Sequence, residues 1–311
     1  MNNQLFKSKV LNITVCSVFV MILSMQHLKA QEDIITFDVG QFAVTLLSEA
    51  QQLGRTNILI GATDEMLKQA VPTGTFPNAM NVFLLETEDK TVLIDAGLGQ
   101  KTVENLEYYG KKASDIDAVF ITHFHGDHIG SLLIDGKKTY PNATLYVAKP
   151  EYDYYMSDAE MSALPENRRG AFTTARTIFT SYKTEVFVPD EPDKAKELIP
   201  GVRGVAAYGH TPGHVGYMIE STGSKLFFWG DLTHAMAIQM PFPEVAVTYD
   251  TDPVKAVECR QKLLKYITDN RIPIAGAHIF YPGMGDIRKN ESTGYIFSPF
   301  CDCGGRILEV K

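Results

Sequence analysis

The sequence predicts an α/β fold, in which short buried strands are followed by helices or by turns. Two observations support this. Apolar runs bounded by turn residues recur along the chain, and a separate segment from Asp252 onwards has helical spacing. With 311 residues, 45% of them hydrophobic, the chain can bury one large core without needing a second domain. The predicted strands are Phe42–Leu47, Val82–Leu85, Thr91–Ile94, Val119–Ile121, Ala143–Val147, Val205–Ala207, Leu226–Trp229 and Ile272–Ala275.

The helices are predicted from different signals. A helix around residues 102–109 follows the third strand, and residues 149–195 mix helical and irregular segments because prolines interrupt the periodicity. Asp252 and Pro253 make a good helix start, as N-cap and first-turn proline. The apolar residues after them recur at helical spacing, which predicts a helix packed against the sheet as an outer layer.

Four metal-binding side chains fall within six residues directly after the strand Val119–Ile121. They are His123, His125, Asp127 and His128. Imidazoles and carboxylates are good ligands for Zn²⁺, and one tight loop directs them at one small volume. A chance polar loop would not need this density, so the segment predicts a metal site.

Three further candidates, His210, Asp231 and His278, lie at the ends of later predicted strands. Taken singly, each could be an ordinary hydrogen-bonded residue at a strand end. A rigid sheet that carries such residues on its loops can bring them together, however, and as a series they are candidate ligands.

In this order the seven residues resemble the ligand set of the metallo-β-lactamase superfamily, and Val92–Leu98 resembles the strand and turn that precede its first ligand loop. The resemblance implies a four-layer αβ/βα sandwich with two divalent metal ions, expected to be zinc, along one edge. His123, His125 and His210 would hold one ion. Asp127, His128 and His278 would hold the other, and Asp231 would bridge both.

Three segments, residues 230–239, 249–252 and 277–285, resemble the branch that contains methyl parathion hydrolase and its lactonase relatives. The implied function is hydrolysis of an ester-like bond, in a lactone or aryl ester or also a phosphotriester, by a metal-bound hydroxide. Asp127 could orient that hydroxide. His234 occupies a position where lactone-cleaving members often have tyrosine, and it could donate a hydrogen bond to the substrate or orient a ligand.

Other functions of the same superfamily stay open as alternatives: a β-lactamase, a thioesterase or, from another class, an iron-dependent dioxygenase. Asp95 is expected near the site as a supporting carboxylate, and His214 as a packed, hydrogen-bonded histidine. The family places material that shapes the substrate entrance where residues 149–195 stand. The aromatic residues of this insertion either line the entrance or pack the insertion itself; they are Tyr152, Tyr154, Tyr155, Phe172 and Phe179.

Residues 1–30 are expected to be a signal peptide, because two lysines precede an apolar run and a cleavage site follows it. The mature domain, residues 31–311, would be periplasmic or secreted and without stable membrane insertion. The net charge of −8, made more negative by loss of the leader's three lysines, argues against a nucleic-acid partner. A small-molecule ester or lactone is the expected partner. The oligomeric state and the pairing of Cys259, Cys301 and Cys303 are not predicted.

Overall fold

The computed structural model describes residues 34–300. The predicted signal peptide, as well as Cys301 and Cys303, lies outside the described residues. Cys259 is a free cysteine on a helix. Among the described helices, none combines the length and the apolar character needed to cross a membrane.

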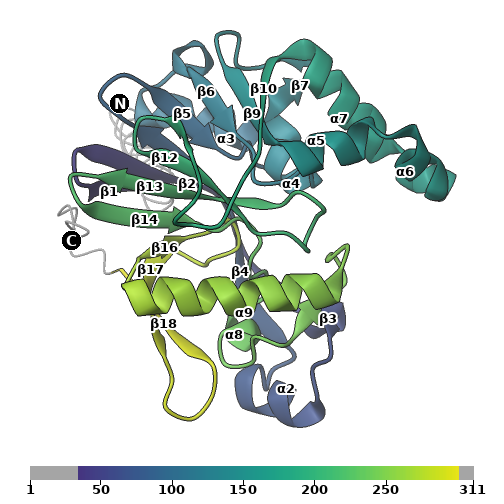
Figure 1. The fold of residues 1–311 in the computed structure, drawn as a ribbon, viewed down its shortest axis with the longest axis vertical. Helices are drawn as coiled ribbons and strands as arrows, with labels where there is room; N and C mark the ends of the chain where they lie inside the picture. The colour runs from purple at the N-terminus through teal and green to yellow at the C-terminus, as the bar shows by residue number, and fades with distance from the viewer. Residues whose placement is uncertain (1–33, 301–311) are drawn as a thin grey trace, which may run out of the picture.

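Two seven-stranded sheets form the body of the protein (Figure 1). The first has the order β1 (Ile34–Val39), β2 (Phe42–Arg55), β4 (Thr75–Glu86), β5 (Thr91–Ile94), β6 (Ala118–Phe120), β9 (Thr144–Ala148), β10 (Lys183–Phe187). The second has the order β11 (Glu197–Ile199), β12 (Val202–Ala206), β13 (Val215–Ser221), β14 (Ser224–Phe228), β16 (Ile274–Ala275), β17 (Met284–Lys289), β18 (Tyr295–Pro299). Two small sheets pair β3 (Leu59–Ile60) with β15 (Ala246–Val247), and β7 (Leu133–Ile134) with β8 (Lys137–Lys138).

The central strands of the first sheet are continuous apolar runs because both of their faces are buried. Successive side chains point to opposite faces of a strand. In β5, Leu93 therefore joins the core on the helix side, whereas Val92 and Ile94 join the core between the sheets. Across the latter core, Phe83 of β4 meets Phe228 of β14 with ring centroids 5.0 Å apart. The two sheets thus pack directly on each other.

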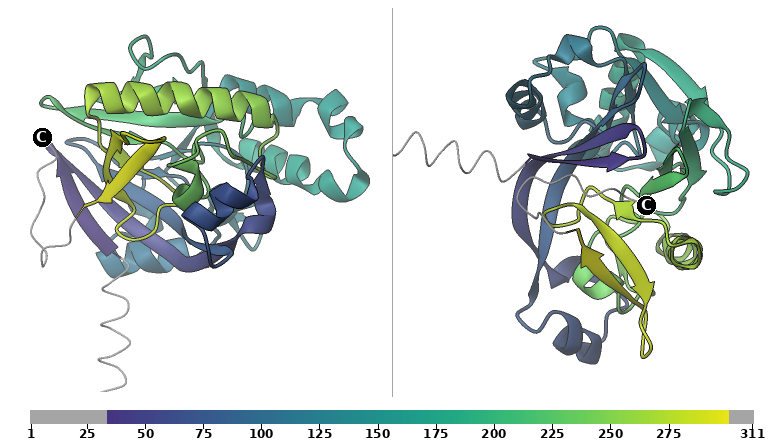
Figure 2. Two further views of the ribbon diagram at one scale, coloured as in Figure 1. Left: turned by 90° about the horizontal axis from the view of Figure 1, so that it is seen from below. Right: turned by 90° about the vertical axis from the view of Figure 1, so that its left-hand side faces the viewer.

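Helices cover the outer face of each sheet. Helices α3, α5 and α7 contribute buried residues to the core behind the first sheet, and α9 contributes to the core behind the second. Figure 2 shows α9 along the outer side of the second sheet, away from the purple strands of the first. The four-layer αβ/βα prediction is therefore confirmed. The helix bounds are α2 (Asp64–Ala70), α3 (Gln100–Tyr109), α4 (Gly126–Ile129), α5 (Lys149–Met156), α6 (Asp158–Ala163), α7 (Gly170–Ser181), α8 (Met236–Gln239) and α9 (Pro253–Asn270).

The structure also differs from the sequence prediction in two places. Strands β2 and β4 run on well past their apolar segments, because residues 48–55 pair with residues 75–81 although most of them are polar or small. The predicted irregular insertion 149–195 contains the strand β10, which pairs with β9. Its Lys183 and Glu185 are exposed at the sheet edge, so no apolar pattern marks it.

The predicted helix start at Asp252 is confirmed, since its side chain accepts a hydrogen bond from Lys255 N at 3.1 Å.

Candidate metal centre

The loops after four strands bring the predicted ligands together. His123 and His125 follow β6, Asp127 and His128 lie on the short helix α4, and the others follow β12, β14 and β16. Potential ligand atoms lie within 4.8 Å of one another in four groups of three. These groups are His123, His125, His210; His123, His128, Asp231; Asp127, His128, His278; and Asp231, His234, His278.

Asp231 lies between the two predicted ligand sets. Its Oδ2 is 3.2 Å from His210 Nε2 and 3.1 Å from His278 Nε2, while its Oδ1 is 3.2 Å from His128 Nε2. On the first side, His125 Nδ1 lies 3.0 Å from His123 Nε2 and 3.1 Å from His210 Nε2. All seven residues therefore lie in one small volume, grouped into the two ligand sets that the resemblance implies. Their ligation of metal ions stays a prediction.

The chemistry of these atoms fits divalent cations. Nδ1 of His128 faces Asp95 Oδ2 at 2.7 Å, Nδ1 of His210 faces Asp250 Oδ1 at 2.8 Å, and Nδ1 of His278 faces the Ala79 carbonyl at 2.8 Å. Such partners hold the proton on Nδ1 and leave the Nε2 lone pair for a metal. His128 Nε2 and Asp231 Oδ1 are buried without a hydrogen-bond partner. Buried polar atoms of this kind are costly unless something such as a cation satisfies them.

The pKa values of the cluster shift in two directions, according to the distance of each imidazole from Asp231. Burial, reinforced by the neighbouring His128, holds the pKa of His123 well below 6.5, so its imidazole is neutral as a ligand must be. Burial and His210 lower the pKa of His125 to about 4. Although burial opposes ionisation of Asp231, the surrounding imidazoles hold its pKa well below the ordinary value. Burial opposes protonation of His128, His210 and His278, but the neighbouring carboxylate of Asp231 raises the pKa of all three imidazoles.

The two supporting roles expected from the sequence agree with the geometry. Asp95 accepts hydrogen bonds from Thr122 N at 2.8 Å and from His128 Nδ1, and so orients a candidate ligand. His214 is fully buried; its Nδ1 donates to the Ala207 carbonyl at 2.7 Å and its Nε2 accepts from Asp231 N at 2.9 Å. At Gly230 (φ 54°), a Cβ would collide with the His214 ring, which explains glycine before Asp231.

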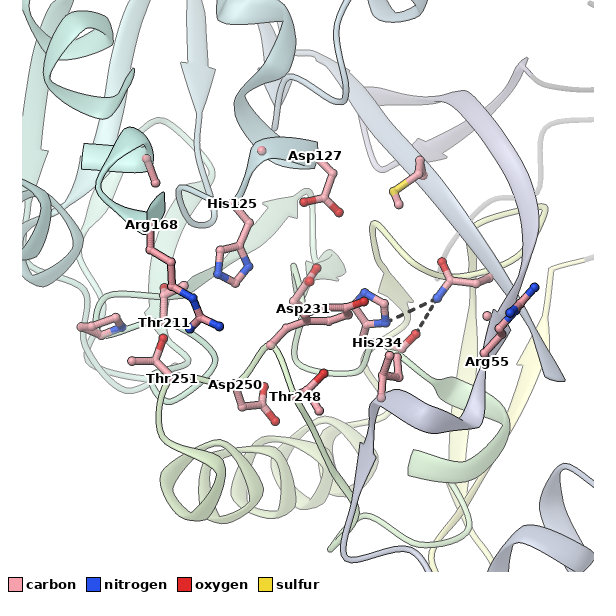
Figure 3. A pocket seen from close by; sticks show the side chains of 18 of the residues that line it. Arg55, His125, Asp127, Arg168, Thr211, Asp231, His234, Thr248, Asp250 and Thr251 are labelled. Atoms are coloured by element: carbon pink, nitrogen blue, oxygen red, sulfur yellow. Dashed lines mark hydrogen bonds between the residues drawn. The ribbon is translucent and has the colours of Figure 1, made fainter. Parts of the chain in front are cut away.

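A cavity of about 980 Å³ opens above the cluster. His125, Asp127, Asp231 and His234 line it (Figure 3), and both apolar and polar residues line the rest. All five insertion aromatics belong to or pack against the core behind the first sheet, and three of them also line this cavity. Both readings of those residues are thus correct in part. The apolar wall residues include Tyr154, Tyr155, Leu164 and Phe172 from the insertion, with Leu53, Ile58 and Met80 opposite, and Arg55 and Arg168 add charged groups to the lining.

His234 lies beside the second ligand set. Its ring centroid is 4.0 Å from that of His278, and Asn78 Nδ2 donates to its backbone carbonyl at 2.8 Å. Because it lines the cavity and also shares a group with Asp231 and His278, both roles expected for it remain open.

Sequence reasoning missed three supporting residues, Asn78, Asp250 and Glu151. Each acts through a contact with a residue far away in the chain, such as Asp250 with His210. No local motif marks them, although Asp250 stands in the segment 249–252 that carried part of the resemblance.

The protein has two facing sheets, and a cluster of histidine and aspartate side chains lies where their loops converge. This is the architecture of an α/β metal-dependent hydrolase. The chain belongs to the metallo-beta-lactamase superfamily, whose family profile matches residues 76–278. The superfamily prediction is confirmed.

Among curated relatives, the cleavage and polyadenylation specificity factor 73 of Drosophila melanogaster is 30% identical over 183 residues, which are 54% of this chain and 26% of that protein. The chain thus spans about a quarter of the length of this first relative.

Two solved structures match far more completely. AidC, described as a dizinc quorum-quenching lactonase in complex with a product, N-hexanoyl-L-homoserine, has a TM-score of 0.77 and 24% identity, covering 86% of this chain and 97% of its own. The hydrolase AbOPH, described as belonging to the beta lactamase superfamily, has a TM-score of 0.76 and 25% identity, covering 86% and 98%. These matches confirm the fold.

Proposed function

We propose that the chain is a dinuclear-metal hydrolase of ester-like bonds, with a lactone or an aryl ester as its substrate. One observation carries the proposal: the seven clustered side chains meet where a cavity of about 980 Å³ opens. Such a volume suits a small molecule, and its aromatic and aliphatic walls suit an acyl chain or an aryl group. The description of AidC as a lactonase with its product bound supports the same substrate class.

In this proposal His123, His125 and His210 would hold one cation, and Asp127, His128 and His278 would hold the other. Asp231, which lies between the two sets, would serve both. When bound, a pair of divalent cations supplies Lewis acidity and makes water a nucleophile near neutral pH.

The chain's own residues then place the reactants. Asp127 is the most accessible predicted ligand in the second set, with 22% of its side chain exposed, and it accepts a hydrogen bond from the attacking water. His234 lines the cavity, and even a neutral imidazole has one N–H, which it donates to the carbonyl or leaving-group oxygen. Tyr154, Tyr155 and Phe172 hold the apolar part of the substrate and exclude water from that side.

The test is a substrate panel on purified, zinc-loaded enzyme with its metal content measured. The panel contains homoserine lactones, aryl esters, phosphotriesters, a β-lactam, a thioester and single-stranded DNA. We expect about two zinc ions per chain, turnover of lactones or aryl esters, and loss of turnover on chelation that zinc restores. A preference for the β-lactam, the thioester or DNA would refute the substrate class. One iron per chain with oxygen uptake would refute the hydrolase.

A further inference from the structure

Glu151 is a buried carboxylate that forms no ion pair with any residue in the described part of the chain. It lies in the first turn of α5 and is only 1% exposed. Among the described residues, the groups bonded to it are donors on two loops. Buried acids are rare unless they are paired, so a fully buried one calls for a role.

Its two oxygens hold two different loops. Oε1 accepts a hydrogen bond from Phe124 N at 2.9 Å. Oε2 accepts from Thr211 Oγ1 at 2.7 Å and from Gly213 N at 2.9 Å. Burial raises the pKa of Glu151, and the three donors oppose that rise. At Gly213 a Cβ would collide with the backbone nitrogen of Glu151, so glycine permits this close approach.

These contacts coincide with one predicted ligand set. Phe124 stands between His123 and His125, and Thr211 and Gly213 directly follow His210. The other set is supported differently, since Asp95 holds His128 and the Ala79 carbonyl holds His278.

We propose that Glu151 is a positioning residue for the first cation: it fixes the spacing between the loop of His123 and His125 and the loop of His210, and leaves the second site unaffected. This inference rests on the proposed function. Its physical basis is that the two loops come from different sheets, after β6 and β12. A common acceptor at Glu151 adds to the hydrogen bond from Val215 N to the Thr122 carbonyl, at 3.0 Å, which also joins them.

The variant Glu151→Gln keeps the shape but replaces one acceptor oxygen with an NH₂ group. Since backbone N–H groups approach both oxygens, the amide must face one of them with a donor. We expect zinc affinity at the first site to fall about 10–100-fold, the range typical for loss of a supporting residue.

The effect of Glu151→Gln on each site is measured separately, by combining it with a second substitution that disables the other site. In His278→Ala, which retains the first site, Glu151→Gln should weaken zinc binding measured by competition with a chelator. In His125→Ala, which retains the second site, it should change binding by less than about threefold. Equal weakening in both backgrounds, or none in either, would overturn the inference.

Matched variants separate positioning from general destabilisation. Thr211→Val removes one of the three hydrogen bonds and should weaken the first site, whereas Thr211→Ser should keep wild-type affinity. Tyr182→Phe removes two other buried hydrogen bonds, from Tyr182 OH to the Leu132 carbonyl at 2.7 Å and from Tyr140 N to the Tyr182 hydroxyl at 3.2 Å, and should leave both sites unchanged. If Glu151→Gln does not fold, the two Thr211 variants decide the question. Equal zinc affinity of the first site in Thr211→Val and Thr211→Ser would overturn the inference. Wild-type protein that binds no zinc would instead refute the proposed function.

Discussion

Tyr217 joins the two sheets directly below the metal-binding loop, and its hydroxyl can be removed without changing the packing. The side chain is fully buried in β13, and its hydroxyl donates to the Ile121 carbonyl, after β6, at 2.7 Å. Its ring stacks on Phe120 with centroids 5.2 Å apart. The variant Tyr217→Phe keeps the ring and leaves a buried carbonyl without this donor. We expect the free energy of unfolding to fall by about 1–3 kcal/mol.

The assay is urea unfolding monitored by circular dichroism, on wild type and variant at the same zinc concentration, since bound metal adds to stability. The control is Tyr266→Phe, which removes an exposed hydrogen bond to Asp193 and should change stability by less than about 0.5 kcal/mol. In a melting experiment, Tyr217→Phe should lower Tm by about 2–4 °C for each kcal/mol lost. A change no larger than that of the control would refute the argument that this hydrogen bond ties the sheets.

Three further variants test the centre. Asp127→Ala should bind about one zinc ion instead of two and lose most turnover while its circular dichroism spectrum is unchanged; full activity would contradict the role of Asp127. In Asp250→Asn a single amide oxygen cannot serve both His210 Nδ1, at 2.8 Å, and Val247 N, at 3.0 Å, so zinc affinity should fall about 10–100-fold, and unchanged affinity would count against this support. His234→Ala should keep both zinc ions and lower kcat about 100-fold; loss of zinc would show that His234 orients a ligand instead.

The cluster of ligand-type side chains could be predicted from the sequence because part of it is concentrated locally. Four ligand-type side chains in residues 123–128 are visible without any fold, and His210, Asp231 and His278 each follow an apolar run. Since strands buried on both faces are continuously apolar, β5 and β6 were also predictable.

Supporting residues were not predictable in the same way. Glu151 is 60 residues from Thr211 and Asp250 is 40 residues from His210, and each looks like an ordinary surface acid in the sequence. The edge strand β10 was missed because its exposed polar residues lack any apolar pattern. Such elements are defined by their partners in space, which the local sequence does not contain.

Helix α5 contributes both to the candidate metal centre and to the cavity wall, through residues about one turn apart on the same side of the helix. Glu151 reaches the histidine loops, while Tyr154 and Tyr155, less than two turns further on, form a wall of the cavity. Substitutions that reshape this wall to admit a bulkier molecule would also shift α5. The candidate metal centre, which Glu151 of the same helix supports, would then be disturbed. Substrate selectivity is therefore better changed on the opposite wall of the cavity, at Leu53 or Ile58. Strand β2 and the turn Thr56–Ile58, which carry these two residues, contain none of the predicted ligands.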